Sequence, residues 1–171
     1  MRVGLLTVSD RAARGDREDL SGQALAATAE SQGWEVVEAA AVPDEAGLIS
    51  ERLREWADAG FVDLILTTGG TGFSARDVTP EATLSVIERL APGLTEAMRS
   101  VGLRTTPHSM LSRAIAGIRG MVLIVNLPGS PKGAVENLKV ILPALPHAVE
   151  ILRGDPGAEQ RHVPPPKPTV A

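Results

Sequence analysis

Apolar runs of strand length alternate with amphipathic stretches in the first part of this 171-residue chain. The runs 3–8, 35–42 and 62–67 are short and apolar, which predicts three buried strands. Between them, 22–32 and 45–59 have the spacing of amphipathic helices. This strand–helix order predicts a parallel sheet with right-handed crossovers and helices on both faces.

Three polar residues stand where these helices and the next one are expected to begin. Ser21 and Asp44 precede the first two, and Thr79 precedes Pro80-Glu81, so each is a candidate N-cap.

The second half continues the pattern less regularly. The expected elements are helices over 80–90 and 94–101, an irregular stretch over 104–112, strands over 114–118 and 121–127 joined as a hairpin, and helical structure over 134–152. The expected fold is therefore an α/β three-layer sandwich with a mostly parallel central sheet, helices on both faces and a small β-hairpin. Residues 1–153 form one predicted domain, and the proline-rich residues 154–171 are expected to be an extended or disordered tail.

Composition excludes several classes of protein. Net charge is −4 and aromatic residues are only 2%, which disfavours a nucleic-acid binder. No apolar run reaches the ~20 residues that span a bilayer, so no membrane segment is expected. The chain has no cysteine, which excludes thiolate chemistry and suits a reducing compartment. We therefore expect a cytoplasmic protein.

A glycine bend follows the third predicted strand, in the sequence Leu66-Thr67-Thr68-Gly69-Gly70-Thr71-Gly72. Glycine allows a tight turn and a close approach of backbone to ligand, and successive N–H groups in such a turn form an anion site. The alternative is an ordinary turn. The strand end, the hydroxyl residues and the acid that follows favour a phosphate site made by Thr68, Gly69, Gly70, Thr71 and Gly72. Thr79 and Glu81 are further candidates, although a helix start would also explain them.

An aspartate lies at or shortly after the end of each of the three strands, namely Asp10, Asp44 and Asp77. Carboxyl ends of parallel strands meet at one edge, where ligands of such sheets bind. Aspartate repels phosphate but binds a hard divalent cation that bridges phosphate oxygens, so the three look like a shared metal site. The alternatives are a turn for Asp10, a helix cap for Asp44 and an Asx turn for Asp77.

A second strand-end loop, Asn126-Leu127-Pro128-Gly129-Ser130, is followed by Lys132. Its amide, hydroxyl and backbone donors would suit a polar or phosphorylated ligand on the opposite wall of the same cleft. An ordinary strand-to-helix turn is the alternative, with Lys132 adding only surface charge.

Other motifs fail. Neither glycine loop has the Gly-x4-Gly-Lys-Ser/Thr pattern of a P-loop. Residues 70–75 fit the loose dinucleotide pattern, but they follow the third strand rather than the first. The three histidines are scattered without ligand spacing.

Several separated motifs carry a resemblance to a known family. They are Thr7-Val8-Ser9-Asp10, Asp19-Leu20-Ser21-Gly22, Val42-Pro43-Asp44-Glu45, the glycine bend, Arg76-Asp77-Val78-Thr79-Pro80-Glu81-Ala82-Thr83 and Asn126-Leu127-Pro128-Gly129-Ser130. In this order, over roughly residues 3–153, the chain resembles the molybdopterin adenylyltransferase family: MogA proteins, the gephyrin G domain and its plant counterpart, with MoaB as a near relative.

The resemblance implies an α/β protein, usually trimeric, that transfers AMP from Mg²⁺-bound ATP to the terminal phosphate of molybdopterin and releases pyrophosphate. The family's acidic catalytic positions match Asp44 and Asp77, which would hold Mg²⁺. Ser9, Asp10, Ser21, Asn126, Pro128, Gly129, Ser130 and Lys132 would lie on the molybdopterin side. The product would be handed on to a molybdate-inserting enzyme.

Three other interpretations stay open. A MoaB-like protein would bind molybdopterin without adenylylating it, although Asp44 and Asp77 with Thr79-Pro80 favour the adenylyltransferase branch. A nicotinamide-dependent oxidoreductase would bind NADH tightly. An assembly scaffold would show no dependence on ATP.

Overall fold

The structure is a computed structural model of the chain, and it describes residues 1–158. One six-stranded sheet forms its centre, with strand order β2-β1-β3-β6-β5-β4. The strands are β1 (Arg2–Val8), β2 (Glu35–Val42), β3 (Leu64–Thr68), β4 (Arg89–Leu90), β5 (Ala116–Arg119) and β6 (Val122–Leu127). Strands β2, β1, β3 and β6 are parallel, while β5 and β4 are antiparallel additions at one edge.

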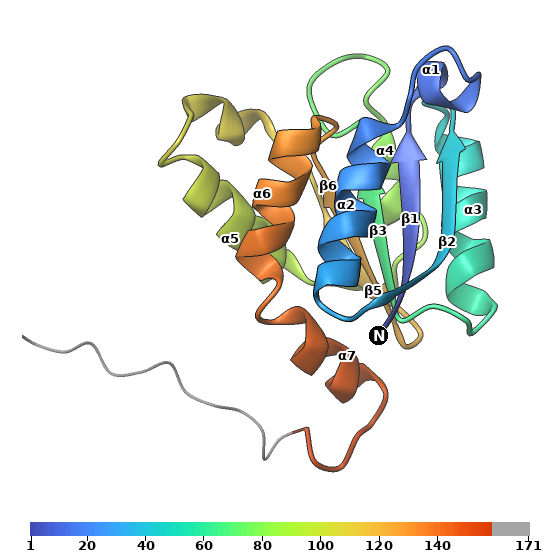
Figure 1. Cartoon of the computed structure of the whole chain (residues 1–171), viewed down its shortest axis with the longest axis vertical. Helices are drawn as coiled ribbons and strands as arrows, with labels where there is room; N and C mark the ends of the chain where they lie inside the picture. Colours follow the sequence, from blue (N-terminus) through green and yellow to red (C-terminus); the bar gives the residue numbers. More distant parts are fainter. Residues whose placement is uncertain (159–171) are drawn as a thin grey trace, which may run out of the picture.

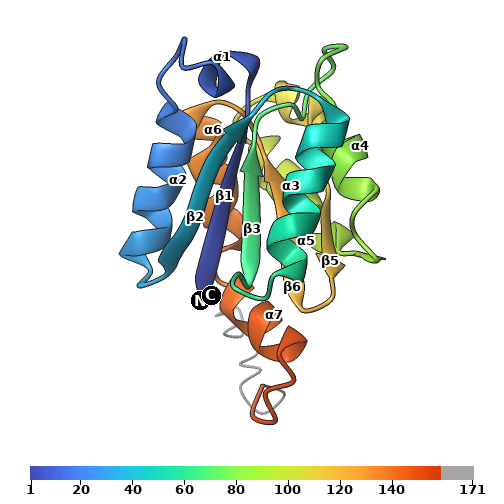
Figure 2. The same ribbon diagram turned by 90° about the vertical axis from the view of Figure 1, so that its right-hand side faces the viewer.

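Helices cover both faces of the sheet. They are α1 (Asp10–Ala13), α2 (Leu20–Ser31), α3 (Ala46–Asp58), α4 (Thr79–Leu84), α5 (Pro92–Gly102), α6 (Pro131–Ile141) and α7 (Leu145–Leu152), with a 3₁₀ turn η1 (Pro107–Leu111). Helices α2, α5 and α6 lie on one side of the sheet, and α3 and α4 lie on the other (Figures 1 and 2). Two apolar cores result. One includes Leu25, Met98 and Leu138, and the other includes Leu53 and Trp56. The expected three-layer α/β architecture is confirmed.

The predicted hairpin exists, but it belongs to the sheet. β5 and β6 pair through a turn at Gly120, and β6 also pairs in parallel with β3. The sequence showed the hairpin but not the partner of its second strand.

The predicted helix over 80–90 is wrong in its second half. Helix α4 ends at Leu84, and Arg89–Leu90 instead pairs with Gly117 and Ile118 of β5. Gly117 permits this approach, because a Cβ there would stand 2.8 Å from the backbone oxygen of Arg89. Pairing with a distant strand overrides the local helical pattern.

All three predicted caps are also wrong. Asp19, not Ser21, caps α2 by accepting from the amide of Gly22. Glu45 occupies the N-cap position of α3 without a side-chain bond, and Val78 precedes α4, so neither Asp44 nor Thr79 is a cap. The side chains of Ser21, Asp44 and Thr79 make tertiary contacts instead.

Two further segments differ in detail. The expected loop after β1 begins with the short helix α1, and the irregular stretch before β5 contains η1. Residues 154–158 form turns after α7, with Ala158 buried, and the rest of the predicted tail lies outside the described residues. Within residues 1–158, no helix combines the length and the apolar character needed to cross a bilayer.

Candidate functional site

The carboxyl ends of β1, β2, β3 and β6 meet at one edge of the sheet, where α1 and the loop after β3 lie (Figure 1). The amide of Ser9 donates to the carbonyl of Val42 at 2.9 Å, which joins the ends of β1 and β2. The hydroxyl of Thr68 donates to the carbonyl of Pro128 at 2.7 Å, which joins the loops after β3 and β6. Four segments that are distant in sequence therefore form one surface.

The glycine bend is tightly packed at the centre of this edge. Gly69 and Gly70 have φ values of +100° and +63°, which only glycine adopts without strain. A Cβ on Gly69 would lie 2.3 Å from the backbone oxygen of Val8, and one on Gly129 would lie 3.1 Å from Cα of Gly69. The bend therefore requires glycine for both conformation and space.

Three consecutive amides of the bend have no protein partner. Within residues 1–158, the N–H groups of Gly70, Thr71 and Gly72 donate to no acceptor, whereas the amide of Gly69 reaches the carbonyl of Leu127 at 3.3 Å. All three residues line one hollow, where water or a ligand can take the place of a protein acceptor. Successive amides of this kind are suited to bind an anion.

Asp10 and Asp44 bind each other's backbone. Oδ2 of Asp44 accepts from the amide of Asp10 at 2.8 Å, and Oδ1 of Asp10 accepts from the amide of Asp44 at 3.2 Å. Both oxygens of Asp10 also accept from Arg76 at 2.7 Å. The side-chain hydrogen bond from Arg76, followed by the bond from the Asp44 amide, holds the pKa of Asp10 below its ordinary value. Asp10 is thus engaged by the protein, while Asp44 keeps one oxygen without a hydrogen bond in the described chain.

Asp77 lies on the other flank of the bend. Its Oδ2 accepts from the amide of Ser74 at 2.8 Å, and its own amide donates to the carbonyl of Ser74 at 2.9 Å. These bonds close a turn between Ser74 and Asp77, but it is not the predicted Asx turn, because the carboxylate accepts from the amide three residues before it and not from one two residues after it. It still leaves Oδ1 of Asp77 without a hydrogen bond in the described chain, and the carboxylate lies close over Gly72.

Two hollows adjoin at the bend. One of about 430 Å³ is lined by Asp44, Gly69 and residues of the β1–α2 segment. The other, of about 840 Å³, is lined by Asp77, Gly72 and residues from α5 to η1 and α6. Gly70 and Gly129 line both hollows. Asp44 and Asp77 therefore flank one shared boundary and do not lie on opposite sides of the molecule.

The donor set fits a magnesium ion held jointly with a phosphorylated ligand. In residues 1–158, no three acidic or histidine side chains are grouped to hold a metal, so the expected cluster of three aspartates is absent. Arg76 neutralises Asp10, which removes it from the set. Mg²⁺ usually keeps several waters and uses one or two carboxylates plus substrate phosphates, and Asp44 and Asp77 can supply these.

Several predicted site residues support the bend from beneath. Asn126 is fully buried, its amide nitrogen donates to Thr67 and Thr83 at 2.9 and 2.8 Å, and its oxygen accepts from the amide of Ile115. The buried hydroxyl of Thr79 donates to the carbonyl of Gly69 at 2.8 Å. These side chains have no group left for a ligand, so we remove Asn126 and Thr79 from the contact residues.

The serines, too, hold structure together. Ser21 donates to the carbonyl of Gly129 at 2.7 Å, while Ser9 and Ser130 cap α1 and α6. All three still line one hollow or the other.

Two charged candidates lie off the hollows. Lys132 is 81% exposed, faces Glu136 on α6 and lines neither hollow, which matches surface charge. Glu81 forms an ion pair with Arg113 and also lines neither.

Sequence reasoning missed three residues. Arg76 ties the loop after β3 to Asp10, and Arg113 binds that loop from outside it. Asp19 caps α2 and accepts from Thr7 at 2.5 Å. The cap signal at Asp19 was available in the sequence. The partners of the arginines lie 32 to 66 residues away, and nothing local indicates them.

Comparison with known proteins agrees with this geometry. The family model described as "Probable molybdopterin binding domain" matches residues 4–147. A molybdopterin adenylyltransferase of Helicobacter pylori (strain J99) is 42% identical over 157 residues, covering 91% of this chain and 89% of that protein. The Escherichia coli K12 protein of the same name is 38% identical, covering 90% and 86%. Gephyrin of Dictyostelium discoideum is 43% identical, but the chain spans only 23% of its length.

Among solved structures, the molybdopterin biosynthesis enzyme MoaB of Thermus thermophilus superposes with a TM-score of 0.85 at 52% identity, covering 90% of this chain and 97% of that one. The fold and site thus define an α/β protein with a polar ligand site at the carboxyl ends of its strands. More specifically, the chain belongs to the molybdopterin-binding domain family.

Proposed function

We propose that this protein is a molybdopterin adenylyltransferase of molybdenum cofactor biosynthesis. An oxygen of the terminal phosphate of molybdopterin attacks the α-phosphorus of ATP, the bond between the α-phosphorus and the bridging oxygen breaks, and pyrophosphate leaves. The observation that carries the proposal is the row of unpaired amides at Gly70, Thr71 and Gly72, flanked by Asp44 and Asp77. The relatives that carry this name, over most of their own length, support it.

The chain's own groups act mainly by positioning. Nucleotidyl transfer needs aligned reactants and neutralised phosphate oxygens rather than covalent help from the protein. Amides of the bend would donate to phosphate oxygens. The carboxylates of Asp44 and Asp77 would hold Mg²⁺, which when bound supplies charge stabilisation for the pyrophosphate leaving group. Pro128, Gly129 and Ser130 would form the facing wall for molybdopterin.

The direct test is transfer of label from ATP labelled on the α-phosphate to molybdopterin in the presence of Mg²⁺. We expect labelled pterin with the unaltered protein and loss of label on removal of Mg²⁺ by a chelator. Asp58→Asn is a matched control, because Asp58 is an aspartate paired with Arg119 away from both hollows. Absence of labelled pterin from the unaltered protein would refute the proposal.

A second candidate is binding of molybdopterin without transfer, which the 52% identity to a structure called MoaB favours. The same experiment separates the two functions. Saturable molybdopterin binding without labelled product would support the second.

The assembly, the receiving partner and the location complete the proposal. We infer a homotrimer, hand-over of the adenylylated product to a molybdate-inserting enzyme, and a cytoplasmic reaction, for which a chain without cysteine is suited. Sedimentation of the purified protein tests the trimer, and a strict monomer would contradict it.

A further inference from the structure

Arg113 contacts the loop after β3 at three points and helix α4 at a fourth. It lies between η1 and β5, and its backbone amide donates to the carbonyl of Thr71 at 2.9 Å. Its Nε donates to the carbonyl of Gly72 at 2.7 Å. One terminal nitrogen donates to the carbonyl of Asp77, and the other donates to the carboxylate of Glu81.

These contacts span the part of the loop that carries Asp77. Gly72 and Asp77 are the two ends of a short excursion, and the guanidinium joins their carbonyls directly. Inside the excursion, the reciprocal bonds between Ser74 and Asp77 close the turn, and the amide of Arg76 donates to the hydroxyl of Ser74 at 3.3 Å. The side chain of Arg76 reaches outward to Asp10 from the middle of the excursion. Arg113 is the side chain that joins the two ends of the excursion, so the position of the Asp77 carboxylate against Gly72 depends on this contact.

Arg113 is placed behind the loop and not in the ligand space. It lines neither hollow, and Nε and both terminal nitrogens already donate to protein oxygens. A guanidinium presents its donors in a rigid planar fork, whereas a lysine ammonium is a flexible point charge. Lysine would keep the charge near Glu81 but would not reach both carbonyls at once.

We infer that Arg113 is a positioning residue, which sets the carboxylate of Asp77 by fixing the carbonyls of Gly72 and Asp77. The structural part of this inference is independent of chemistry. Its consequence for AMP transfer rests on the function proposed above.

Hydrogen exchange in the protein without ligands tests the structural part. Arg113→Gln and Arg113→Lys are both expected to speed exchange at the amides of Ser74 and Asp77 about tenfold or more, because local opening becomes easier. Arg119→Gln is the matched control, since Arg119 also joins a carboxylate and a carbonyl, on β5 away from both hollows. It should leave these two amides unchanged. Unchanged exchange in both Arg113 variants would overturn the inference.

Transfer kinetics test the consequence. Arg113→Gln should lower kcat about tenfold or more and raise the Mg²⁺ requirement about tenfold, with the KM for molybdopterin within about twofold. Arg113→Lys should resemble Arg113→Gln. When Asp77→Asn is already present, adding Arg113→Gln should lower kcat by less than about a further twofold, because Arg113 acts through Asp77.

Each other result has a defined meaning. Equal losses with and without the Asp77 carboxylate would show that Arg113 acts directly, and wild-type transfer by Arg113→Lys would show that only charge matters. Either result overturns the positioning role. A wild-type protein that transfers no AMP, combined with faster exchange in the Arg113 variants, would refute the proposed function while supporting the hold on the loop.

Discussion

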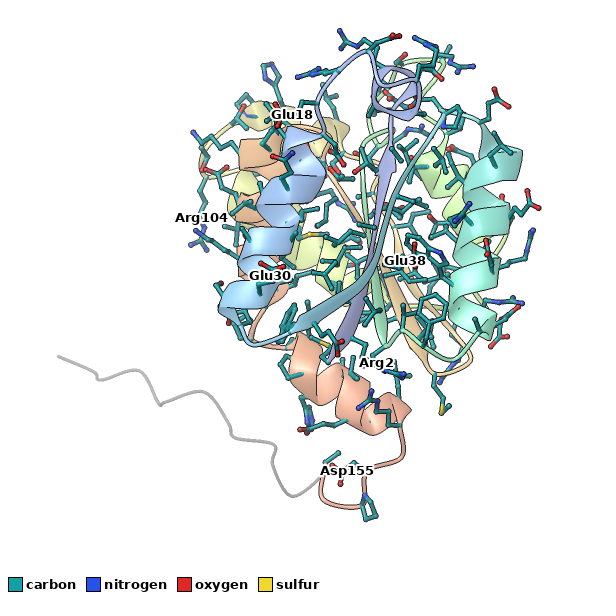
Figure 3. The ribbon with its side chains drawn as sticks, turned by 45° about the vertical axis from the view of Figure 1, so that its right-hand side comes forward. Arg2, Glu18, Glu30, Glu38, Arg104 and Asp155 are labelled. Carbon is teal, nitrogen blue, oxygen red and sulfur yellow. The ribbon has the colours of Figure 1, made fainter. Side chains whose placement is uncertain are left out.

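Asp63 at the amino end of the parallel sheet differs from Asp44 and Asp77 at its carboxyl end in how many of its carboxylate oxygens the protein binds. At the amino end, Asp63 is 3% exposed and accepts from the backbone of Arg2 at 2.6 Å and from its guanidinium at 2.9 Å, with a further bond from Arg153. Figure 3 shows Arg2 at this end beside α7, while Glu18 marks the opposite end. At the carboxyl end, Asp44 and Asp77 each have one hydrogen-bonded oxygen, and the donor is a backbone amide.

The difference separates a structural acid from acids that remain available for chemistry. Burial on its own raises the pKa of Asp63, but hydrogen bonds from Arg2 and Arg153 outweigh it and leave that pKa below its ordinary value. Both oxygens of Asp63 are engaged by positive or N–H groups. An aspartate with a free oxygen beside unpaired amides has no such structural explanation, which makes Asp44 and Asp77 the better candidates for a ligand.

The largest effect is expected at the carboxyl end. Asp77→Asn and Asp44→Asn should each lower AMP transfer about 100-fold or more, because the neutral amide removes a charge from the pair proposed to hold Mg²⁺. The thermal midpoint should change little, since each carboxylate accepts a single hydrogen bond within residues 1–158. Transfer assays and thermal unfolding of the same preparations measure both. Wild-type turnover by either variant would show that its carboxylate is not needed for transfer, and the contrast with Asp63 would not hold.

The next effect is on stability, at the amino end. Asp63→Asn should lower the free energy of unfolding by about 2 kcal/mol, because it leaves buried donors without their charged acceptor. This figure is reduced for the exposure of Arg2 and Arg153, which are 40% and 47% exposed. Denaturant unfolding measures the loss, and transfer should be retained where the variant is folded. Loss of transfer without loss of stability would contradict a purely structural Asp63.

A smaller effect should appear in the pH dependence of unfolding. The folded pKa of Asp63 is lowered, so its stabilisation is present above the unfolded value of about 3.9 and is lost as pH falls through the folded value. The wild-type advantage over Asp63→Asn should therefore be constant near neutral pH and shrink below about pH 4. Parallel denaturant titrations of the two proteins measure this advantage. A stability advantage of the wild type that grows as pH falls would contradict the lowered pKa of Asp63.

The smallest effect is expected at the exposed pair of Asp10 and Arg76, whose side chains are 31% and 56% exposed. Arg76→Gln should lower the thermal midpoint slightly at low salt and not at about 1 M salt, where such pairs are screened. Transfer should change less than about threefold, because Asp10 would serve to join loops and not to bind metal. A loss of AMP transfer as large as that of Asp77→Asn would instead place Asp10 beside Asp44 and Asp77 among the residues proposed to bind the metal.

Local signals along the chain are enough to predict the layered α/β fold and the edge of the sheet at which the site lies. Apolar strand runs, amphipathic helices and the glycine bend are local signals, and parallel strands bring their carboxyl ends together whatever the loops contain. Asp44, Asp77 and the glycines could therefore be placed near one another without coordinates. The role of Gly69 was also readable, because a turn with positive φ favours glycine.

Which polar groups are already hydrogen-bonded depends on contacts that form when the chain folds. Asn126 and Thr79 look like ligand residues in the sequence. In the core, however, Asn126 donates to Thr67 and Thr83, and Thr79 donates to the carbonyl of Gly69, so both side chains are already hydrogen-bonded. The same holds for Asp10, which Arg76 neutralises, and for Arg113, whose partners come from a distant loop. Hydrogen-bond satisfaction depends on groups that folding brings together from afar, so a local pattern names candidate donors and acceptors but not those left free.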